Sequence, residues 1–281
     1  MSHKFSVKAI LFVLFAIGSA ISSSMVSART LNDIDAVHKS AWQRTLALRI
    51  AKAHLQMAAN VDYLSASNQL SSSIEEYSKA LAELQLNAPS SQINQRIIET
   101  QAVWQRFRET AEATPSATSV VAVMELSDDL MYENDRLMRL WQARLPAQFG
   151  TEMEQALEQS MLSERIGVLY TAHYYGINDE WVQKELQYTV KAYEKGMQTI
   201  TSKSDIEKDT LNQLVSNWEY AKFGLEQFNN EKLIPVVMAV TVESMYHQTN
   251  SLGEGYLQRA RVAFNDAKGI TDTGLAVNYS E

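Results

Sequence analysis

The sequence predicts an all-α protein, built as two tandem four-helix bundles after a signal peptide, and three observations indicate this fold. Apolar residues recur at alternating steps of three and four along most of the chain, which is the period of an amphipathic helix. The four prolines all lie at the edges of such segments, where proline is tolerated, and the period-two alternation of strands is scarce. The helical pattern also repeats after 116 residues.

Residues 1–28 have the composition of a secretory signal peptide. Lys4 and Lys8 give a basic start, residues 9–17 form an apolar core, and residues 26–28 are small enough for cleavage. We therefore expect a cleaved signal and a periplasmic protein. An N-terminal membrane anchor is the alternative, because the stretch that follows the apolar core is only mildly polar.

Residues 29–147 are expected to form the first four-helix bundle. A seam of apolar residues predicts helices over 31–60 and 64–87. The next two helices, 91–113 and 117–145, each start after a serine that can accept a hydrogen bond from a free backbone amide, Ser90 and Ser116. Both helices end before a proline.

Residues 148–267 are expected to form the second bundle, and residues 268–281, rich in Gly, Thr and Ser, a disordered tail. Ser204 is a further expected N-cap. The four predicted helices span 151–175, 179–202, 205–229 and 233–266.

The two predicted bundles align with each other without a gap over their first two helices. The shift of 116 residues matches identical residues at seven positions: Gln43, Leu46, Arg49, Ile50, Leu70, Tyr77 and Lys79 meet Gln159, Leu162, Arg165, Ile166, Leu186, Tyr193 and Lys195. In the later helices the shift becomes 114, and Trp104 meets Trp218. We infer an internal duplication in which each copy is one four-helix bundle.

The composition excludes several classes of function. With no cysteine, the chain has no disulfide, no thiolate metal site and no covalent haem attachment. Without the signal it carries 23 basic and 33 acidic residues, and this net charge of −10 argues against nucleic acid as a partner. We find no catalytic motif and no paired Glu-x-x-His of a di-iron bundle, so we expect neither an enzyme nor a bound cofactor or metal.

One charged residue interrupts the apolar seam of the first helix. Arg44 stands among Ile34, Val37, Ala41 and Leu48, and a buried arginine needs a partner. One interpretation is that its planar guanidinium binds a small anion such as nitrate, nitrite or a carboxylate. The other is that it pairs with a carboxylate of a neighbouring helix, such as Asp128, Glu133 or Asp135, or extends its charged group to the end of the bundle.

The surrounding sequence resembles a known family. WQRTLALRIAK, from Trp42 to Lys52, and EQSMLSERI, from Glu158 to Ile166, are similar to the motif of PilJ-type domains. These are the N-terminal domains of type IV pilus methyl-accepting chemotaxis transducers, and they resemble the sensor region of NarX-like nitrate and nitrite kinases. The resemblance implies an extracytoplasmic four-helix ligand-sensing module, often paired across a symmetric interface. It assigns the anion contact to Arg44.

The candidate ligand-binding residues are therefore Arg44, Leu48 and Arg49 in the first copy, and Ser160 and Arg165 in the second. Ser160 replaces the motif arginine, and Glu164, at the place of Leu48, would repel an anion. The recurrence of Arg49 as Arg165 favours a shared structural duty, such as an interhelical salt bridge.

We expect an exported, sensor-like module that binds a small anion. Receptors of the family continue into a transmembrane helix and a signalling region, which are not found here, so signalling would need a membrane receptor or kinase as partner. The alternative is a non-catalytic helical interaction or scaffold protein that has lost the ligand site. The sequence also leaves the pairing open: the two copies can pack on each other, or the first copies of two chains can form a homodimer.

Overall fold

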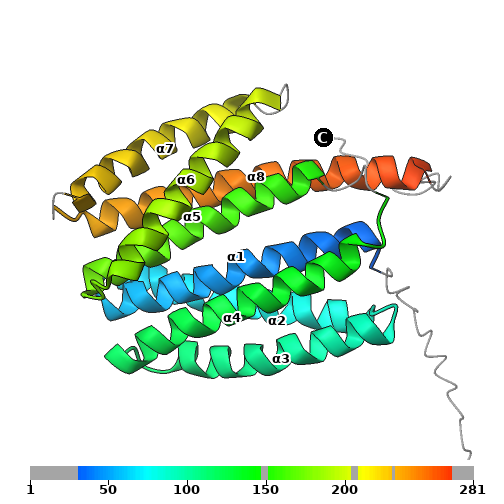
Figure 1. Cartoon of the computed structure of the whole chain (residues 1–281), viewed down its shortest axis with the longest axis horizontal. Coiled ribbons are helices and arrows are strands. Elements are labelled where there is room, and N and C mark those ends of the chain that lie inside the picture. Colours follow the sequence, from blue (N-terminus) through cyan, green and yellow to red (C-terminus); the bar gives the residue numbers. More distant parts are fainter. Residues whose placement is uncertain (1–30, 147–150, 204–207, 230–231, 268–281) are drawn as a thin grey trace, which may run out of the picture. The chain divides into compact units, whose positions relative to one another are not determined.

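The computed structural model describes residues 31–146, 151–203, 208–229 and 232–267, and these residues form eight α-helices and no strand (Figure 1). The predicted all-α fold is confirmed. The expected signal peptide, the expected cap at Ser204 and the expected tail lie outside the described residues.

The first bundle consists of four helices whose bounds lie within three residues of the predicted ones. They are α1 (Asp33–Ala58), α2 (Tyr63–Leu86), α3 (Ser91–Glu112) and α4 (Ala117–Gln142). Two serines cap helices as predicted. Ser90 accepts a hydrogen bond from the amide of Ile93 at 3.3 Å, and Ser116 forms a reciprocal capping box with Ser119.

The second bundle consists of α5 (Thr151–Tyr175), α6 (Glu180–Lys203), α7 (Lys208–Asn229) and α8 (Pro235–Ala267). Proline is tolerated at the start of α8 because the first helical amides need no intrahelical partner. No helix in the described ranges has the length and apolar character needed to cross a membrane.

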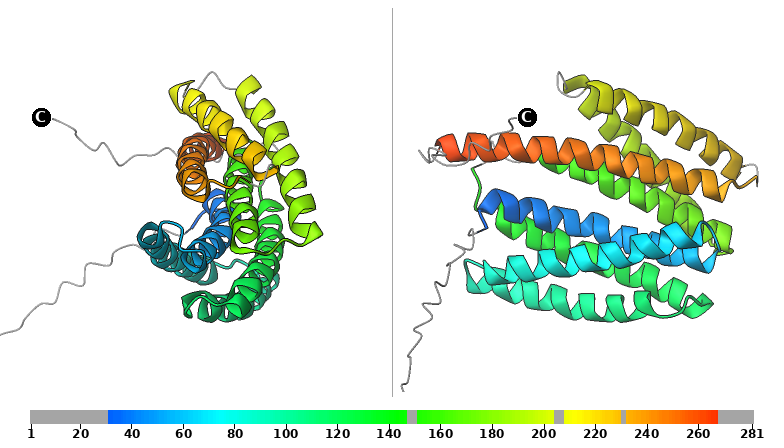
Figure 2. Two further views of the ribbon diagram at one scale, coloured as in Figure 1. Left: turned by 90° about the vertical axis from the view of Figure 1, so that its left-hand side faces the viewer. Right: turned by 180° about the vertical axis from the view of Figure 1, so that it is seen from behind.

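The two bundles meet along α1 and α5, which run side by side at the centre of the helix arrangement (Figures 1 and 2). Within the bundles, α1 packs mainly on α2 and α4, and α5 packs mainly on α6 and α8. The helices α1 and α5 run in the same direction (Figure 1). They pack nearly in register with the repeat, since Arg49 of α1 contacts Glu164 of α5, the equivalent of Leu48. The structure therefore pairs the two repeats within one chain.

Helix α1 is buried on every side. From Ser40 to Gln56 each residue is buried, including polar side chains that lie off the apolar seam, such as Lys52 and His54. A helix covered all round is a core helix rather than an amphipathic surface helix. The apolar seam describes the face of α1 that packs in its own bundle, and the second bundle covers the opposite face.

An aromatic pair occupies the core of each bundle. The rings of Tyr77 and Trp104 stack with centroids 4.0 Å apart, and the equivalent Tyr193 and Trp218 lie 4.6 Å apart. The two pairs differ in their hydrogen bonds. The hydroxyl of Tyr77 bonds to the side chain of Asn134 at 3.1 Å, whereas that of Tyr193 has no partner among the described residues. This shared packing supports the inferred duplication.

Candidate functional site

Four charged side chains meet where α1 crosses the second bundle. We call Arg49, Lys52, Glu164 and Glu243 the interface charge cluster. Arg49 donates two hydrogen bonds to Glu243 of α8, at 2.6 and 2.7 Å, and one to Glu164 at 3.2 Å. The ammonium of Lys52 lies 2.8 Å from Glu164 and 3.4 Å from Glu243. Two positive and two negative charges thus compensate one another between the repeats.

Burial makes this compensation necessary. The side chains of Lys52 and Glu164 are fully buried, and an uncompensated charge in such a place is very costly. Burial raises the pKa of the Glu243 carboxyl, but the hydrogen bonds from Arg49 and the charge of Lys52 outweigh it and bring the pKa to about 2. Arg49 also lies over the ring of Tyr246, with its guanidinium carbon 3.8 Å from the ring centroid.

Arg165 occupies the position of Arg49 in the second repeat, and it forms an ion pair with the first repeat. It extends from α5 to Asp128 of α4 and also pairs with Glu185 of α6 at 3.3 Å. Each of the two equivalent arginines therefore forms ion pairs with the last helix of the other repeat. Both make interhelical salt bridges, as their recurrence in the sequence indicated.

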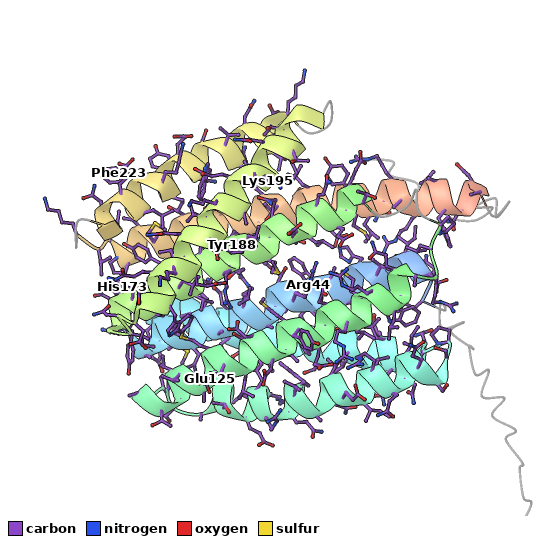
Figure 3. The ribbon with its side chains drawn as sticks, in the orientation of Figure 1. Arg44, Glu125, His173, Tyr188, Lys195 and Phe223 are labelled. Carbon is purple, nitrogen blue, oxygen red and sulfur yellow. The ribbon has the colours of Figure 1, made fainter. Side chains whose placement is uncertain are left out.

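Arg44 lies on α1 near the middle of the molecule (Figure 3) and has an acidic partner in its own bundle. Its Nη1 is 3.2 Å from Asp135 of α4, while its Nη2 is buried without a hydrogen-bond partner among the described residues. Burial lowers the pKa of Arg44, and the charges of Asp135, Glu154 and Glu158 act against that shift. The pair with Asp135 is the second of the two interpretations of Arg44, and three nearby carboxylates disfavour an added anion.

The other candidates are also held at or near the junction of the repeats. Leu48 and Ser160 are fully buried, and the hydroxyl of Ser160 has no hydrogen-bond partner within the described ranges. None of the five candidate residues lines either of the two grooves described next. Arg49 thus contacts charged side chains of the second repeat, whereas Arg44 lies on the wall of neither groove.

An opening between the repeats forms a groove of about 270 Å³, which we call the inter-repeat groove. Its walls are α1 and α2 of the first repeat and α8 of the second, three helices that lie next to one another in the view from behind (Figure 2). Most of its charged side chains are paired. Asp35 accepts from Arg261 at 2.5 Å, and Lys39 lies 2.8 Å from Glu83.

Three charged side chains of the inter-repeat groove are exposed to solvent and make no ion pair with a permanently charged side chain among the described residues. Glu254 of α8 lies 3.3 Å from His38, and burial with the charges of Arg261 and Lys39 lowers the pKa of His38 to about 3, so the imidazole is neutral at pH 7. Arg261 and Lys39 also act on Glu254 through their charge, but burial and the charges of Asp35 and Glu76 outweigh them and raise the pKa of Glu254. Glu76 accepts a hydrogen bond of 2.6 Å from the indole of Trp42, a neutral donor. Lys79 has no ion-pair partner in the described part of the chain.

A second groove, of about 520 Å³, lies between α5 and α6, and we call it the α5–α6 groove. Six of its lining residues are the repeat equivalents of residues in the inter-repeat groove: Gln155, Glu158, Ala192, Lys195, Gly196 and Thr199 correspond to Lys39, Trp42, Glu76, Lys79, Ala80 and Glu83. Only one of these six equivalent pairs is identical, Lys195 with Lys79 (Lys195 is labelled in Figure 3). The two repeats thus carry hollows at the same place with different chemistry.

Sequence reasoning did not identify Lys52, Glu243 or the lining of the grooves. One signal was present, because the first helix has few charges on any face and therefore resembles a core helix. The pattern of apolar residues could not identify Glu164 as the partner of Lys52, since it describes contacts within one bundle and this pair joins two. No cluster of His, Cys, Asp and Glu that could hold a metal ion occurs within the described ranges.

Comparison of the sequence and the structure with protein-family models, curated proteins and solved structures gives no match.

Proposed function

We propose that this chain is an exported, non-catalytic, sensor-like module that binds a small ligand between its two repeats and acts through a membrane receptor or kinase. The observation that carries the proposal is the inter-repeat groove, whose walls come from both repeats and whose charges are not fully compensated. Concave sites with a few polar groups are where small ligands bind.

A ligand in this groove would contact α1 and α2 of one repeat and α8 of the other. If the two repeats can pack in more than one arrangement, the ligand favours the arrangement that it binds most tightly. The shift in free energy equals the difference in its binding free energy between the arrangements. A membrane partner that recognises one arrangement would respond to such a change. This coupling is what a sensor that acts through a partner requires.

The resemblance to PilJ-type and NarX-like domains supports the same class of function and a periplasmic location. It also supports pairing as the functional state, since domains of that family often work as symmetric pairs. In this chain α1 of one repeat packs on α5 of the other. A homodimer is then not needed to complete the pair, and we propose the single chain as the working unit.

The charges around Arg44 favour a different ligand site from the one suggested by the resemblance. Asp135 lies 3.2 Å from Nη1 of Arg44, and Glu154 and Glu158 act on it through their charge. A nitrate ion would have to displace Asp135 or add to this negative field. Anion binding by Arg44 remains a proposal, and only the unpartnered Nη2 favours it.

A scaffold protein without a ligand is the second candidate. The interface charge cluster favours it, because the arginine at position 49 is fully used in holding the repeats together. In this case the two bundles form a rigid support for other proteins, and the grooves carry no ligand.

Isothermal titration of the mature protein against a panel of small charged molecules separates these functions. The panel contains nitrate, nitrite, acetate, simple amines and free amino acids. Binding that persists in Arg44→Ala supports a site in the inter-repeat groove, whereas binding of an anion that is lost in Arg44→Ala supports the anion sensor. Absence of heat and of a thermal shift with every member of the panel contradicts ligand binding and leaves the scaffold.

A further inference from the structure

We propose that the inter-repeat groove binds a small zwitterion that carries an ammonium and a carboxylate, as a free amino acid does. The ammonium lies between Glu76 and Glu254, and the carboxylate lies at Lys79. This assignment rests on the proposed ligand-binding function and names the chemical class of its ligand.

The first step concerns the two carboxylates on opposite walls. Glu76 belongs to α2 and Glu254 to α8. Burial raises the pKa of Glu254, the charges of Arg261 and Lys39 lower it, and the negative charges of Asp35 and Glu76 add to the rise. The nearest side chain to Glu254 is His38, which is buried and makes no hydrogen bond through Nε2. The neutral imidazole adds no charge, and Arg261 and Lys39, each paired with another carboxylate, balance Glu254 only in part, so a cation that enters the groove gains from both carboxylates.

The second step concerns the orientation of Glu76. Its Oε1 accepts a hydrogen bond from the indole nitrogen of Trp42 at 2.6 Å. Trp42 is itself buried and packs on Tyr246, with ring centroids 5.5 Å apart. The carboxylate is therefore held in place, while its second oxygen makes no hydrogen bond within the described residues and is open to a ligand. A preorganised acceptor of this kind lowers the entropic cost of binding.

The third step concerns the positive charge. Lys79 follows Glu76 by three residues on α2, which places the two side chains on one face of the helix, with Cβ atoms about 5–6 Å apart. The other cations of the groove are already paired, Lys39 with Glu83 and Arg261 with Asp35. Lys79 is then the group that remains for a ligand carboxylate, at a short distance from the site of the ammonium.

The balance of these three groups selects the ligand class. A simple anion at Lys79 would face two carboxylates that the cations of the groove do not fully balance, and a simple amine would leave Lys79 without a partner. A zwitterion satisfies both ends. The groove volume of about 270 Å³ is of the size that admits such a molecule.

The second repeat offers a natural contrast. In the α5–α6 groove Lys195 stands at the place of Lys79, but Ala192 replaces Glu76. This groove keeps the lysine, but its one carboxylate, Glu158, stands on α5 at the place of Trp42 rather than at the place of Glu76, so it cannot hold the ammonium in the same way. One zwitterion per chain is the expected stoichiometry.

The experiment is a titration of the full mature chain, unfolded, dialysed and refolded to remove any ligand acquired in the cell. Free amino acids are compared with the amine and the carboxylate of the same carbon skeleton. We expect at least one amino acid to bind at one site per chain, tenfold or more tighter than either fragment. Glu76→Gln, which keeps an acceptor for Trp42, and Glu254→Gln should each weaken this binding tenfold or more.

Two control variants carry matched changes outside the proposed contacts. Glu83→Gln removes a carboxylate of the same groove that is already paired with Lys39, and Lys195→Gln removes the equivalent lysine in the other groove. Both should bind with wild-type affinity, and thermal unfolding checks that all variants fold. Amino-acid binding that is unchanged in Glu76→Gln and Glu254→Gln overturns the assignment. Binding of anions alone also overturns it but leaves the proposed function standing, whereas binding of nothing removes both.

Discussion

Arg49 and Arg165 occupy equivalent positions in the two repeats, and each forms ion pairs with the last helix of the other repeat, Arg49 with Glu243 of α8 and Arg165 with Asp128 of α4. The links are reciprocal, as in a symmetric dimer. Their surroundings differ, because only Arg49 belongs to a larger cluster that includes the buried Lys52 and Glu164. The stability of the inter-repeat contact should therefore depend unequally on the two sides.

The first prediction concerns the buried pair of this cluster. Glu164→Leu places in the second repeat the residue that the first repeat has at Leu48. It leaves the fully buried Lys52 with Glu243 alone, 3.4 Å away, which Arg49 already occupies. We expect a loss of about 2–4 kcal/mol in the free energy of unfolding, measured by urea denaturation.

The double variant Lys52→Met, Glu164→Leu is the control for this prediction. It removes one charge of each sign and keeps the pair of Arg49 with Glu243. We expect it to recover most of the lost stability, because an apolar pair of similar volume often replaces a buried ion pair without loss. A double variant as unstable as Glu164→Leu would contradict the charge argument.

The second prediction concerns acid. The pKa of Glu243 is about 2 in the folded protein against an ordinary 4.5, so the folded state favours the ionised form. A lowered pKa contributes stability that is complete above the unfolded value and disappears as the pH falls toward the folded value. Stability should therefore decrease between about pH 5 and pH 2, with Glu243 contributing up to about 3 kcal/mol.

Chemical denaturation at a series of pH values tests this dependence in the wild type and in Glu243→Gln. The variant should be less stable than the wild type at pH 7, and the difference should shrink toward pH 2. A constant difference over the whole range would mean that the carboxylate charge does not act through Arg49 and Lys52.

The third prediction concerns the two core tyrosines. The hydroxyl of Tyr77 bonds to Asn134, whereas that of Tyr193 is buried with no partner among the described residues. Tyr77→Phe should cost about 1 kcal/mol or more, because it removes a hydrogen bond and leaves the Asn134 amide buried. Tyr193→Phe should be neutral or stabilising. Thermal unfolding of the two variants measures both, and equal losses would contradict the difference in hydrogen bonding.

The fourth prediction concerns Gly167, where α1 approaches α5. A Cβ atom at this position would lie 2.8 Å from Cδ of Lys52 and 3.1 Å from Val242. Because the ion pairs hold Lys52 in place, Gly167→Ala should destabilise the protein by about 1–3 kcal/mol. At Gly253 a Cβ atom would meet only Leu157, at 3.3 Å or more. Gly253→Ala is the control, and its loss in Tm should be clearly the smaller one.

The sequence was sufficient for the helices because each has a local signal. Apolar seams define the helix faces, and Ser90 and Ser116 mark two starts that the structure shows as caps. The predicted bounds differ by up to three residues, for example at the end of α4, which closes at Gln142 rather than at residue 145. Helix ends depend on a single turn, and neighbouring residues there are nearly equivalent in energy.

The site was less predictable because it is made by contacts between the repeats. The seam identified Arg44 as a buried charge and named Asp135 among its possible partners, and the structure shows that pair. It could not show that Lys52 is buried too, since the second bundle covers that face. Residues of the inter-repeat groove lie more than 200 positions apart in the chain, as Asp35 and Arg261 do, and no local pattern connects them. The assignment of an anion to Arg44 stays a prediction.

The parallel packing of α1 on α5 has a consequence for how such a protein can evolve. In a dimer of identical chains every substitution appears at both half-sites, and a change that benefits one side is imposed on the other. Two halves joined in one polypeptide are free of that constraint. Trp42 and Glu76 can be retained on one side while Glu158 and Ala192 arise on the other. The two repeats then keep the same helix arrangement from their common ancestor, while each can acquire different binding residues.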